Sequence, residues 1–198
     1  AHVTAAACGG VPPFDTIALG QSASALLEIS MSLSMYQASI PVFTRQLNNL
    51  STILGIAAAH AEEKKIEQSV FLNARLAPDM FPLSRQVQIA CDGAKAGAAL
   101  LAGVDAPSHA DDEASFAELQ ARITKTLDFL HSLDAAQIDG SEARTVTLKR
   151  RDKETHFQGQ AFLLDHVMPN FYFHYTTAYA ILRHNGVAIG KRDFLGTR

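Results

Sequence analysis

The fold is decided by residues 116–133, which read FAELQARITKTLDFLHSL. Apolar residues recur there at steps of three and four, so they lie along one stripe of a helix with 3.6 residues per turn. Asp111 or Asp112 can cap the start of this helix, and Asp139 and Gly140 mark the loop after it. The stripe expected to face a core consists of Phe116, Leu119, Ile123, Leu127, Leu130 and Leu133.

Three other segments repeat this period. One predicts a helix over about 34–63, in which Pro41 either kinks the first turns or marks the helix start. A second helix is expected over 82–103, where small residues allow close packing. The last begins around Pro169 and stops at residue 186. Four amphipathic helices predict an all-α fold, a four-helix bundle.

The remaining segments predict short additions to the bundle. Residues 68–80 lose the helical period and indicate a loop with a short helical turn. Between 144 and 158 the pattern changes to alternation around a charged centre, which is typical of a small exposed β-hairpin before the last helix. We interpret this hairpin as a decoration, and we expect the tail 186–196 to pack back on the bundle.

Composition excludes several classes of partner. Of the 198 residues, 47% are hydrophobic and 19% are charged, which is ordinary for a single globular domain. The net charge of −3 comes without a dense Lys/Arg cluster, so nucleic acid and membrane surfaces are poor partners. No apolar run approaches the roughly 20 residues that a membrane span needs. Cys8 and Cys91 lack the spacing of a metal site, and we predict a cytoplasmic protein.

The beginning of the chain differs from the rest. Residues 1–30 are rich in Ala, Ser, Gly and Pro and show no helical period until their last few positions. Met31 then opens the patterned segment. We therefore expect residues 1–30 to be a non-native or disordered extension and the bundle domain to cover 31–198.

The last helix places an ionisable residue in its apolar stripe. His174 shares that stripe with Phe171 and Ile181, and a buried imidazole needs a partner. Asn170 lies one turn earlier, and His166 lies one turn before that if the helix continues through the proline. Such a row can bind a metal. Alternatively, His174 is a core histidine hydrogen-bonded to a neighbouring side chain.

The second helix offers a polar row that can face this histidine. Arg85, Gln88 and Asp92 stand at positions i, i+3 and i+7 and so share one side of the helix. Asp92 can bind a metal or orient an imidazole. Alternatively, the row is a solvated helix face with a local ion pair. On the last helix, Tyr179 and its aromatic neighbours can line a ligand cavity or form an oligomer face, and we expect a homodimer.

Three stretches of the sequence resemble a known family. They are MSLSMYQASIPVF (31–43), LAPDMFPLSRQVQIACD (76–92) and PNFYFHYTTAYAILRHNGVAIGKRDFLG (169–196). They are similar to an uncharacterised bacterial family, known as a domain of unknown function, within the DinB/YfiT-like superfamily of proposed metalloenzymes. The resemblance implies an up-down-down-up four-helix bundle and often a dimer. It also implies a divalent metal held by one histidine of the second helix and an H-x-x-x-H pair on the last, and some members transfer small thiols.

This sequence departs from that ligand pattern. If His174 takes the first position of the pair, Ala178 stands at the second, and the second helix carries no histidine. A divalent metal such as Zn or Ni is then held by His174, Asp92 and His166, or the metal has been lost and a polar pocket remains between the second and last helices. The expected pocket residues are Arg85, Gln88, Asp92, Asn170, His174 and Tyr179.

These residues leave three functions open. The first is a DinB-like protein whose polar pocket is a degenerate or atypical metal site. The second is a non-catalytic module that binds a small ligand or acts in a stress response. The third is a metal-dependent enzyme that resembles the thiol transferases of the superfamily. A shared fold does not choose among them.

Overall fold

The structure is a computed structural model that describes residues 33–150 and 152–196. The extension predicted for residues 1–30 lies outside the described residues. Within them, no helix has the length and apolar character needed to cross a bilayer.

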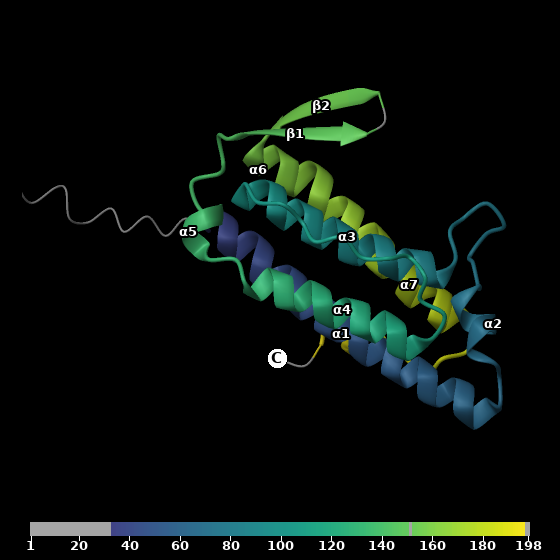
Figure 1. Cartoon of the computed structure of the whole chain (residues 1–198). Helices are drawn as coiled ribbons and strands as arrows, with labels where there is room; N and C mark the ends of the chain where they lie inside the picture. The colour runs from purple at the N-terminus through teal and green to yellow at the C-terminus, as the bar shows by residue number, and fades with distance from the viewer. Residues whose placement is uncertain (1–32, 151, 197–198) are drawn as a thin grey trace, which may run out of the picture. The chain divides into compact units, whose positions relative to one another are not determined.

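Four long helices form the bundle: α1 (Met35–Lys64), α3 (Leu83–Ala102), α4 (Phe116–His131) and α7 (Met168–His184). In Figure 1, α1 and α7 run from left to right, whereas α3 and α4 run from right to left. The order is therefore up-down-down-up, which confirms the predicted bundle. Helix α3 packs against both α4 and α7, and α1 packs against α4.

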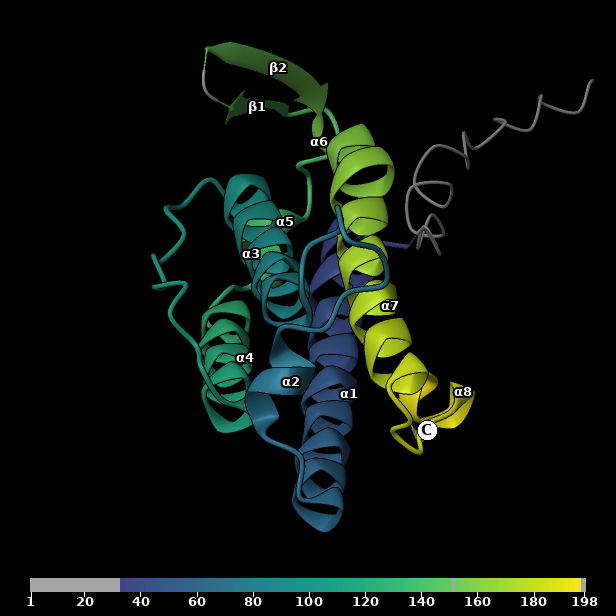
Figure 2. The same cartoon turned by 90° about the vertical axis from the view of Figure 1, so that its right-hand side faces the viewer.

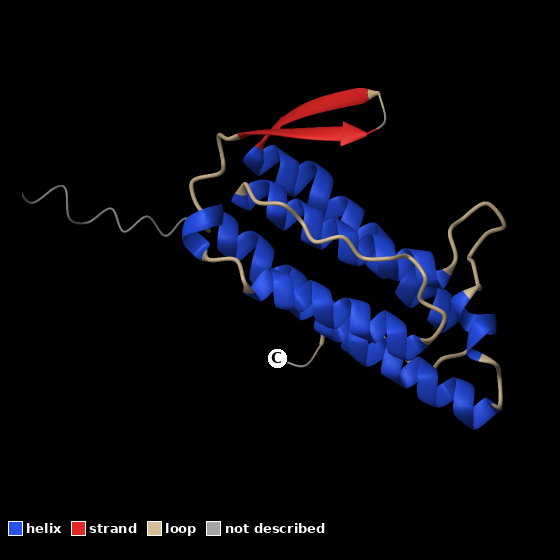
Figure 3. Cartoon of the chain, viewed as in Figure 1, coloured by secondary structure: helices blue, strands red, loops and turns tan. Residues whose placement is uncertain are grey.

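Because α3 and α4 are parallel neighbours in sequence, the chain has to return along the whole bundle between them. A helix of 20 residues such as α3 is about 30 Å long, and residues 103–115 can span about 40 Å when extended. Figure 3 shows this connection as a tan line that runs beside the helices. We call residues 103–115 the crossover segment.

Short elements complete the chain: α2 (Gln68–Leu72), α5 (Ala135–Ile138) and α8 (Lys191–Leu195). The predicted helical turn in the 68–80 loop is therefore confirmed. The tail packs back on the bundle as expected, because Phe194 accepts hydrogen bonds from Tyr175 Oη at 2.6 Å and Asn49 Nδ2 at 3.3 Å.

Two helix starts show how well capping can be anticipated. Helix α1 begins one residue after the predicted position, and Pro41 lies inside it. The prediction that Asp111 or Asp112 caps α4 is wrong. Ser115 is the cap, since its Oγ accepts a hydrogen bond from the Glu118 N–H at 3.2 Å. Asp111 instead forms ion pairs with two arginines, a use that local sequence does not reveal.

The last helix, α7, begins at Met168, as predicted, but helical structure also precedes it. Strands β1 (Thr145–Arg150) and β2 (Lys153–Gln158) form the expected antiparallel hairpin, and α6 (Gly159–Ala161) and the π-helical segment η1 (Phe162–Val167) lead directly into α7. Helical structure therefore starts ten residues before Pro169. The wider π turn precedes Pro169, where a proline ring would otherwise crowd the carbonyl one turn back.

The hairpin is more than a decoration. Figure 2 shows it next to α6, at the end of the bundle where the last helix starts. Val146 is buried, and Phe157 packs against Phe162 with ring centroids 5.7 Å apart. The hairpin therefore contributes side chains to the wall of the bundle beside η1.

Candidate functional site

His174 is buried where α3 packs against α7, a region that we call the seam. Its side chain is almost enclosed, and Nδ1 lies 2.7 Å from Gln86 Oε1. Gln86 Nε2 donates to the Phe81 carbonyl at 3.0 Å, which assigns Oε1 as the acceptor for His174. His174 is thus a core histidine with a side-chain partner, one of the two predicted alternatives. Burial lowers the pKa of His174, and the positive charge of Arg85 lowers it further.

The seam is narrow because small residues of α3 face α7. A Cβ atom on Gly97 would lie 2.5 Å from a Val167 methyl, so a side chain there requires the helices to separate. A Cβ on Gly93 would lie 3.4 Å from Asn170 Nδ2. Gly93 and Gly97 therefore set how closely the last helix approaches α3.

The polar row of α3 bonds to the crossover segment and α4 rather than to His174. Gln88 donates to Glu113 at 2.8 Å, and Arg85 forms an ion pair with Asp111. Asp92 accepts from Arg122 through both carboxylate oxygens, each 2.9 Å from Nη2. This row is not the solvated helix face with a local ion pair predicted as one alternative, because Gln88 is buried and the partners of Arg85 and Asp92 come from distant segments.

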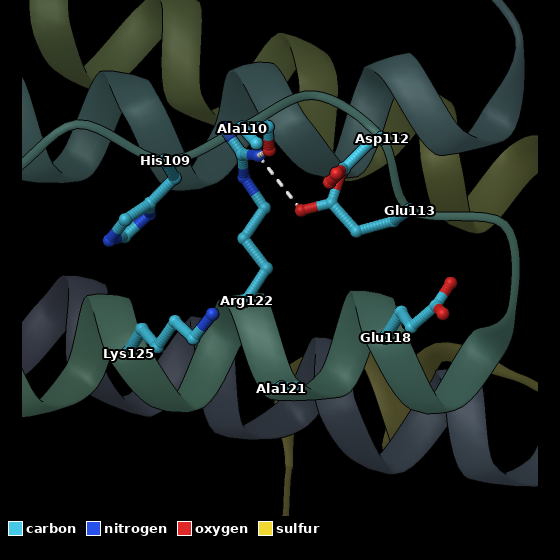
Figure 4. Close-up of a pocket in the computed structure, with 8 residues that line it drawn as sticks. All are labelled: His109, Ala110, Asp112, Glu113, Glu118, Ala121, Arg122 and Lys125. Carbon is cyan, nitrogen blue, oxygen red and sulfur yellow. Dashed lines mark hydrogen bonds and ion pairs between the residues drawn. The ribbon is translucent and has the colours of Figure 1, made fainter.

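Arg122 of α4 is the centre of this network. Its side chain is only 1% exposed, and it pairs with three carboxylates, those of Asp92 (2.9 Å), Asp111 (3.0 Å) and Glu113 (2.9 Å). It also donates to the Ala110 carbonyl at 2.7 Å. Figure 4 shows the guanidinium reaching from α4 to the crossover segment. We call this group the Arg122 network.

Charge pairing outweighs desolvation throughout the Arg122 network. Burial opposes ionisation of Asp111 and Glu113. Hydrogen bonds and positive charge from Arg85 and Arg122 nevertheless hold the pKa of Asp111 below its usual range, and hydrogen bonds from Arg122 and Gln88 do the same for the pKa of Glu113. Burial also opposes the charge on Arg122, and its bonds to Glu113 and Asp92 raise its pKa nonetheless. Asp111, Glu113 and Arg122 are therefore charged at neutral pH.

Arg122 and Gln86 were not predicted from the sequence as site residues. Arg122 stands beside Ile123 and three residues after Leu119, on the apolar side of its helix, and this misplaced charge was a usable signal. Gln86 gave no such signal, because it lies outside the chosen polar row.

A cavity of about 200 Å³ lies between α3 and the η1–α7 segment, and we call it the seam cavity. Three residues predicted from the sequence line it: Asp92, His166 and Asn170. The other predicted pocket residues lie elsewhere: Arg85 and Gln88 contact the crossover segment, His174 bonds to Gln86, and Tyr179 packs against Phe194. The apolar wall consists of Ile89, Leu100, Leu148, Phe162 and Val167, above Gly93, Ala96 and Gly97.

The predicted metal ligands do not fit a metal site. His174 Nδ1 is bonded to Gln86, and the Asp92 carboxylate is held by Arg122 and by Lys95 at 3.0 Å. The His166 ring stacks on Phe162 with centroids 5.8 Å apart. Among the residues that the structure describes, no three His, Cys, Asp or Glu side chains are grouped to hold one ion.

Cys91 is not placed for thiolate chemistry. Its side chain is fully buried in α3. Burial raises the pKa of this thiol to about 12, although the charge of Arg122 acts in the opposite direction. Because the thiolate is the nucleophilic form, Cys91 is inert at neutral pH.

Comparison with known proteins identifies the family. The family model described as a domain of unknown function, DUF1993, matches residues 35–195. The chain belongs to this family. A solved structure titled as a DinB family member protein from Shewanella denitrificans is 45% identical and superposes with a TM-score of 0.76. The match covers 82% of this chain and 92% of that one, while no curated protein matches.

These findings confirm the family-level resemblance inferred from the sequence. The DUF1993 match begins at the first residue of α1 and ends at the last residue of α8, so it spans all the elements described above. Neither the family description nor the structure title states a ligand or a reaction. Function therefore has to be argued from the side chains themselves.

Proposed function

We propose that this protein binds a small organic molecule in the seam cavity, with Asp92, His166 and Asn170 as its polar contacts. The observation that carries the proposal is that one cavity of about 200 Å³ combines these three polar side chains with an apolar wall. Small-molecule sites typically have this composition: mostly apolar lining with a few polar groups that orient the ligand.

The charges around Asp92 limit the ligand. Its carboxylate bonds to Arg122 and Lys95, so its negative charge is already compensated. An ionised carboxylate has about four acceptor positions, and the Asp92 side chain is 38% exposed, so it has acceptor capacity left for a ligand. The local balance favours a neutral hydrogen-bond donor over a full cation.

The His166 ring favours a flat or apolar ligand body. It stacks on Phe162 and lies 5.4 Å from the Phe157 ring, which comes from the hairpin. Aromatic surfaces of this kind bind planar groups through offset stacking. The cavity also borders the π turn of η1, and π turns recur at functional sites. A small planar molecule with a neutral donor, such as an aromatic amide or phenol, suits these walls.

A thermal-shift screen of small neutral aromatic amides, phenols and thiols tests this function. A ligand present at 100 times its Kd should stabilise the protein by about 2.7 kcal/mol. Ala96→Leu adds side-chain volume at an exposed position that lines the cavity and should abolish the shift. Ala117→Leu, an equal change on an exposed position of α4 outside the cavity, should retain it.

The screen also separates this function from its alternatives. Equal loss of binding in Ala96→Leu and Ala117→Leu, or a hit that binds both variants as well as the parent, contradicts the seam cavity as the site. The degenerate metal site and the metal-dependent thiol transferase, both predicted from the sequence, gain no support from the described side chains, because the predicted ligand set does not converge.

A further inference from the structure

We propose that a second cavity, between the crossover segment and α4, binds a small oxyanion, the carboxylate or phosphate group of a small molecule. The contacts are the Arg122 Nε–H and the side chains of His109 and Lys125. This cavity has a volume of about 220 Å³ and is lined by the crossover segment from His109 to Glu113 and by α4 from Glu118 to Lys125. We call it the crossover cavity. The proposal is independent of ligand binding in the seam cavity.

The first observation is an unused donor on Arg122. Its Nη1 bonds to Ala110 and Glu113, and its Nη2 bonds to Asp92 and Asp111. Nε is buried, and it has no hydrogen-bond partner among the described residues. A guanidinium has five N–H donors, and leaving a buried one unpaired costs free energy, so a buried orphan donor beside a cavity points to an occupant.

The second observation is a matching orphan on His109. Its Nδ1 is also buried and has no hydrogen-bond partner in the described part of the chain. His109 lines the same cavity as Arg122, although the two residues come from different segments. Lys125 follows Arg122 by three residues on α4, so both side chains project from one side of the helix. No ion pair with a described residue neutralises Lys125.

The charges in the crossover cavity are separated. In Figure 4, His109 and Lys125 lie on one side of the Arg122 side chain, whereas Asp112, Glu113 and Glu118 lie on the other. The carboxylates that pair with Arg122 take its two Nη groups, which leaves Nε as the donor of this guanidinium without a partner among the described residues. A small anion therefore meets three nitrogen donors on that side without displacing a carboxylate.

The environment of His109 agrees with a site for a negative group. Burial lowers the pKa of His109, and the charges of Lys95, Arg122 and Lys125 lower it further, against the opposing charge of Asp92. These groups come from both helices that face the crossover segment, α3 and α4. An anion bound among them favours the imidazolium and raises this pKa. Binding should therefore strengthen as the pH falls through the pKa of His109.

The size of the crossover cavity fits a small oxyanion. Its volume is several times the roughly 30 Å³ that one water occupies in the liquid. Acetate and inorganic phosphate are comparable in size to a few waters, so the cavity has room for either anion. Charge-assisted hydrogen bonds from arginine, lysine and histidine to carboxylate or phosphate are shorter and stronger than neutral ones.

The test is an NMR titration of the full chain with acetate and with inorganic phosphate, at constant ionic strength and with chloride as the reference anion. We expect saturable shifts of the His109 ring signals and a rise in the pKa of His109. Lys125→Gln should weaken binding about tenfold, which corresponds to one charge-assisted contact. Lys191→Gln, an equal change on α8 away from the cavity, should leave the affinity unchanged.

The relative affinities identify the kind of ligand. Tighter binding of phosphate indicates a phosphorylated molecule, and tighter binding of acetate indicates a carboxylic acid. Shifts that do not saturate, equal shifts with chloride, or equal affinities for Lys125→Gln and Lys191→Gln overturn the proposal. So does a crystal structure grown with either anion that shows only a water at Arg122 Nε. The lysine variants leave the Arg122 network intact, so misfolding does not obscure the result.

Discussion

Helix α3 takes part in two contacts of opposite character. On the side of α7, the seam is built from small residues that bring the helices close, and a single hydrogen bond joins His174 to Gln86. On the side of α4, the Arg122 network joins three carboxylates through one buried guanidinium. Because α3 and α4 run parallel, the crossover segment has to connect them. Its acidic residues Asp111 and Glu113 form ion pairs with Arg122. The contact of α3 with α7 is thus stabilised by close packing, whereas its contact with α4 is stabilised by ion pairs.

Asp92 belongs to both regions. Its carboxylate holds Arg122, and its side chain also lines the seam cavity. A ligand at Asp92 therefore contacts the same residue that anchors the Arg122 network. We expect substitutions on the α4 side of α3, where the contacts are charged, to destabilise the protein more than substitutions in the seam.

Replacing Arg122 should destabilise the protein most. Arg122→Met keeps part of the apolar stem but leaves three carboxylates without their common partner. Breaking a buried pair in this way costs about 3 kcal/mol, the low end of the usual range because Asp92 and Asp111 are partly exposed. Urea denaturation measures the loss, with Arg183→Met on the exposed side of α7 as the control. A loss below about 0.5 kcal/mol, as for an ordinary surface position, contradicts the structural role of the network.

Acid should reduce the contribution of the Arg122 network to the free energy of unfolding. The pKa values of Asp111 and Glu113 are lowered in the folded protein, so their contribution is complete above their unfolded pKa values and is lost as the pH falls through the folded ones. We expect the free energy of unfolding to drop below about pH 4. Arg122→Met should show a smaller drop in denaturant titrations over the same range. If the free energy of unfolding falls equally with pH in the parent and in Arg122→Met, the Arg122 network is not the origin of the acid sensitivity.

The seam should respond to the loss of one hydrogen bond. Gln86→Leu leaves the buried His174 Nδ1 unpaired and should cost about 1–3 kcal/mol. Adding His174→Phe removes the unpaired group and should recover part of that loss, which a double-mutant cycle in urea resolves. If the double variant is as unstable as the sum of the single variants, the two side chains do not interact.

Through His174, the seam should also make the free energy of unfolding decrease between neutral and mildly acidic pH. The pKa of His174 is lowered in the folded state, so its contribution is present above the unfolded value near 6.5 and is lost as the pH falls below it. His174→Phe should remove this change between pH 7 and pH 5, measured as the difference in midpoint of urea denaturation. An unchanged difference assigns the titration to another group.

Divalent metal should have the smallest effect. The predicted set of His174, Asp92 and His166 does not converge, so we expect neither Zn nor Ni to raise the melting temperature. Metal analysis of the purified chain measures the same property directly. If the purified chain contains stoichiometric metal and the His174→Ala variant does not, His174 is a metal ligand and the prediction of no metal effect is wrong.

The expected homodimer remains a prediction. Light scattering of the full chain over a range of concentrations measures it directly. The outer side of the last helix carries exposed apolar side chains, Leu164 and Phe173, the latter 58% exposed. A monomer at every concentration contradicts the predicted homodimer.

Most of the fold could be predicted from the sequence, because an amphipathic helix has a periodic pattern of apolar residues that can be recognised locally. The apolar periods of α1, α3 and α4 matched their helices to within a residue or two, since each stripe faces the same core. The start of α7 at Met168 also agrees with the prediction, but the helical segment before it, α6 and η1, was missed because Pro169 is an ordinary helix breaker. The cap of α4 was wrong because Asp111 has a stronger partner in Arg122.

The sequence by itself determined that His174 would be buried, because its place in an apolar stripe depends only on residues one turn away. Only the tertiary structure decided which groups it and Asp92 would meet. Gln86 is 88 residues from His174, and Arg122 is 30 residues from Asp92. Such contacts depend on how α3 is rotated between α4 and α7, and no local period encodes that rotation. The packing of small residues against α7 and of charges against α4 settles it.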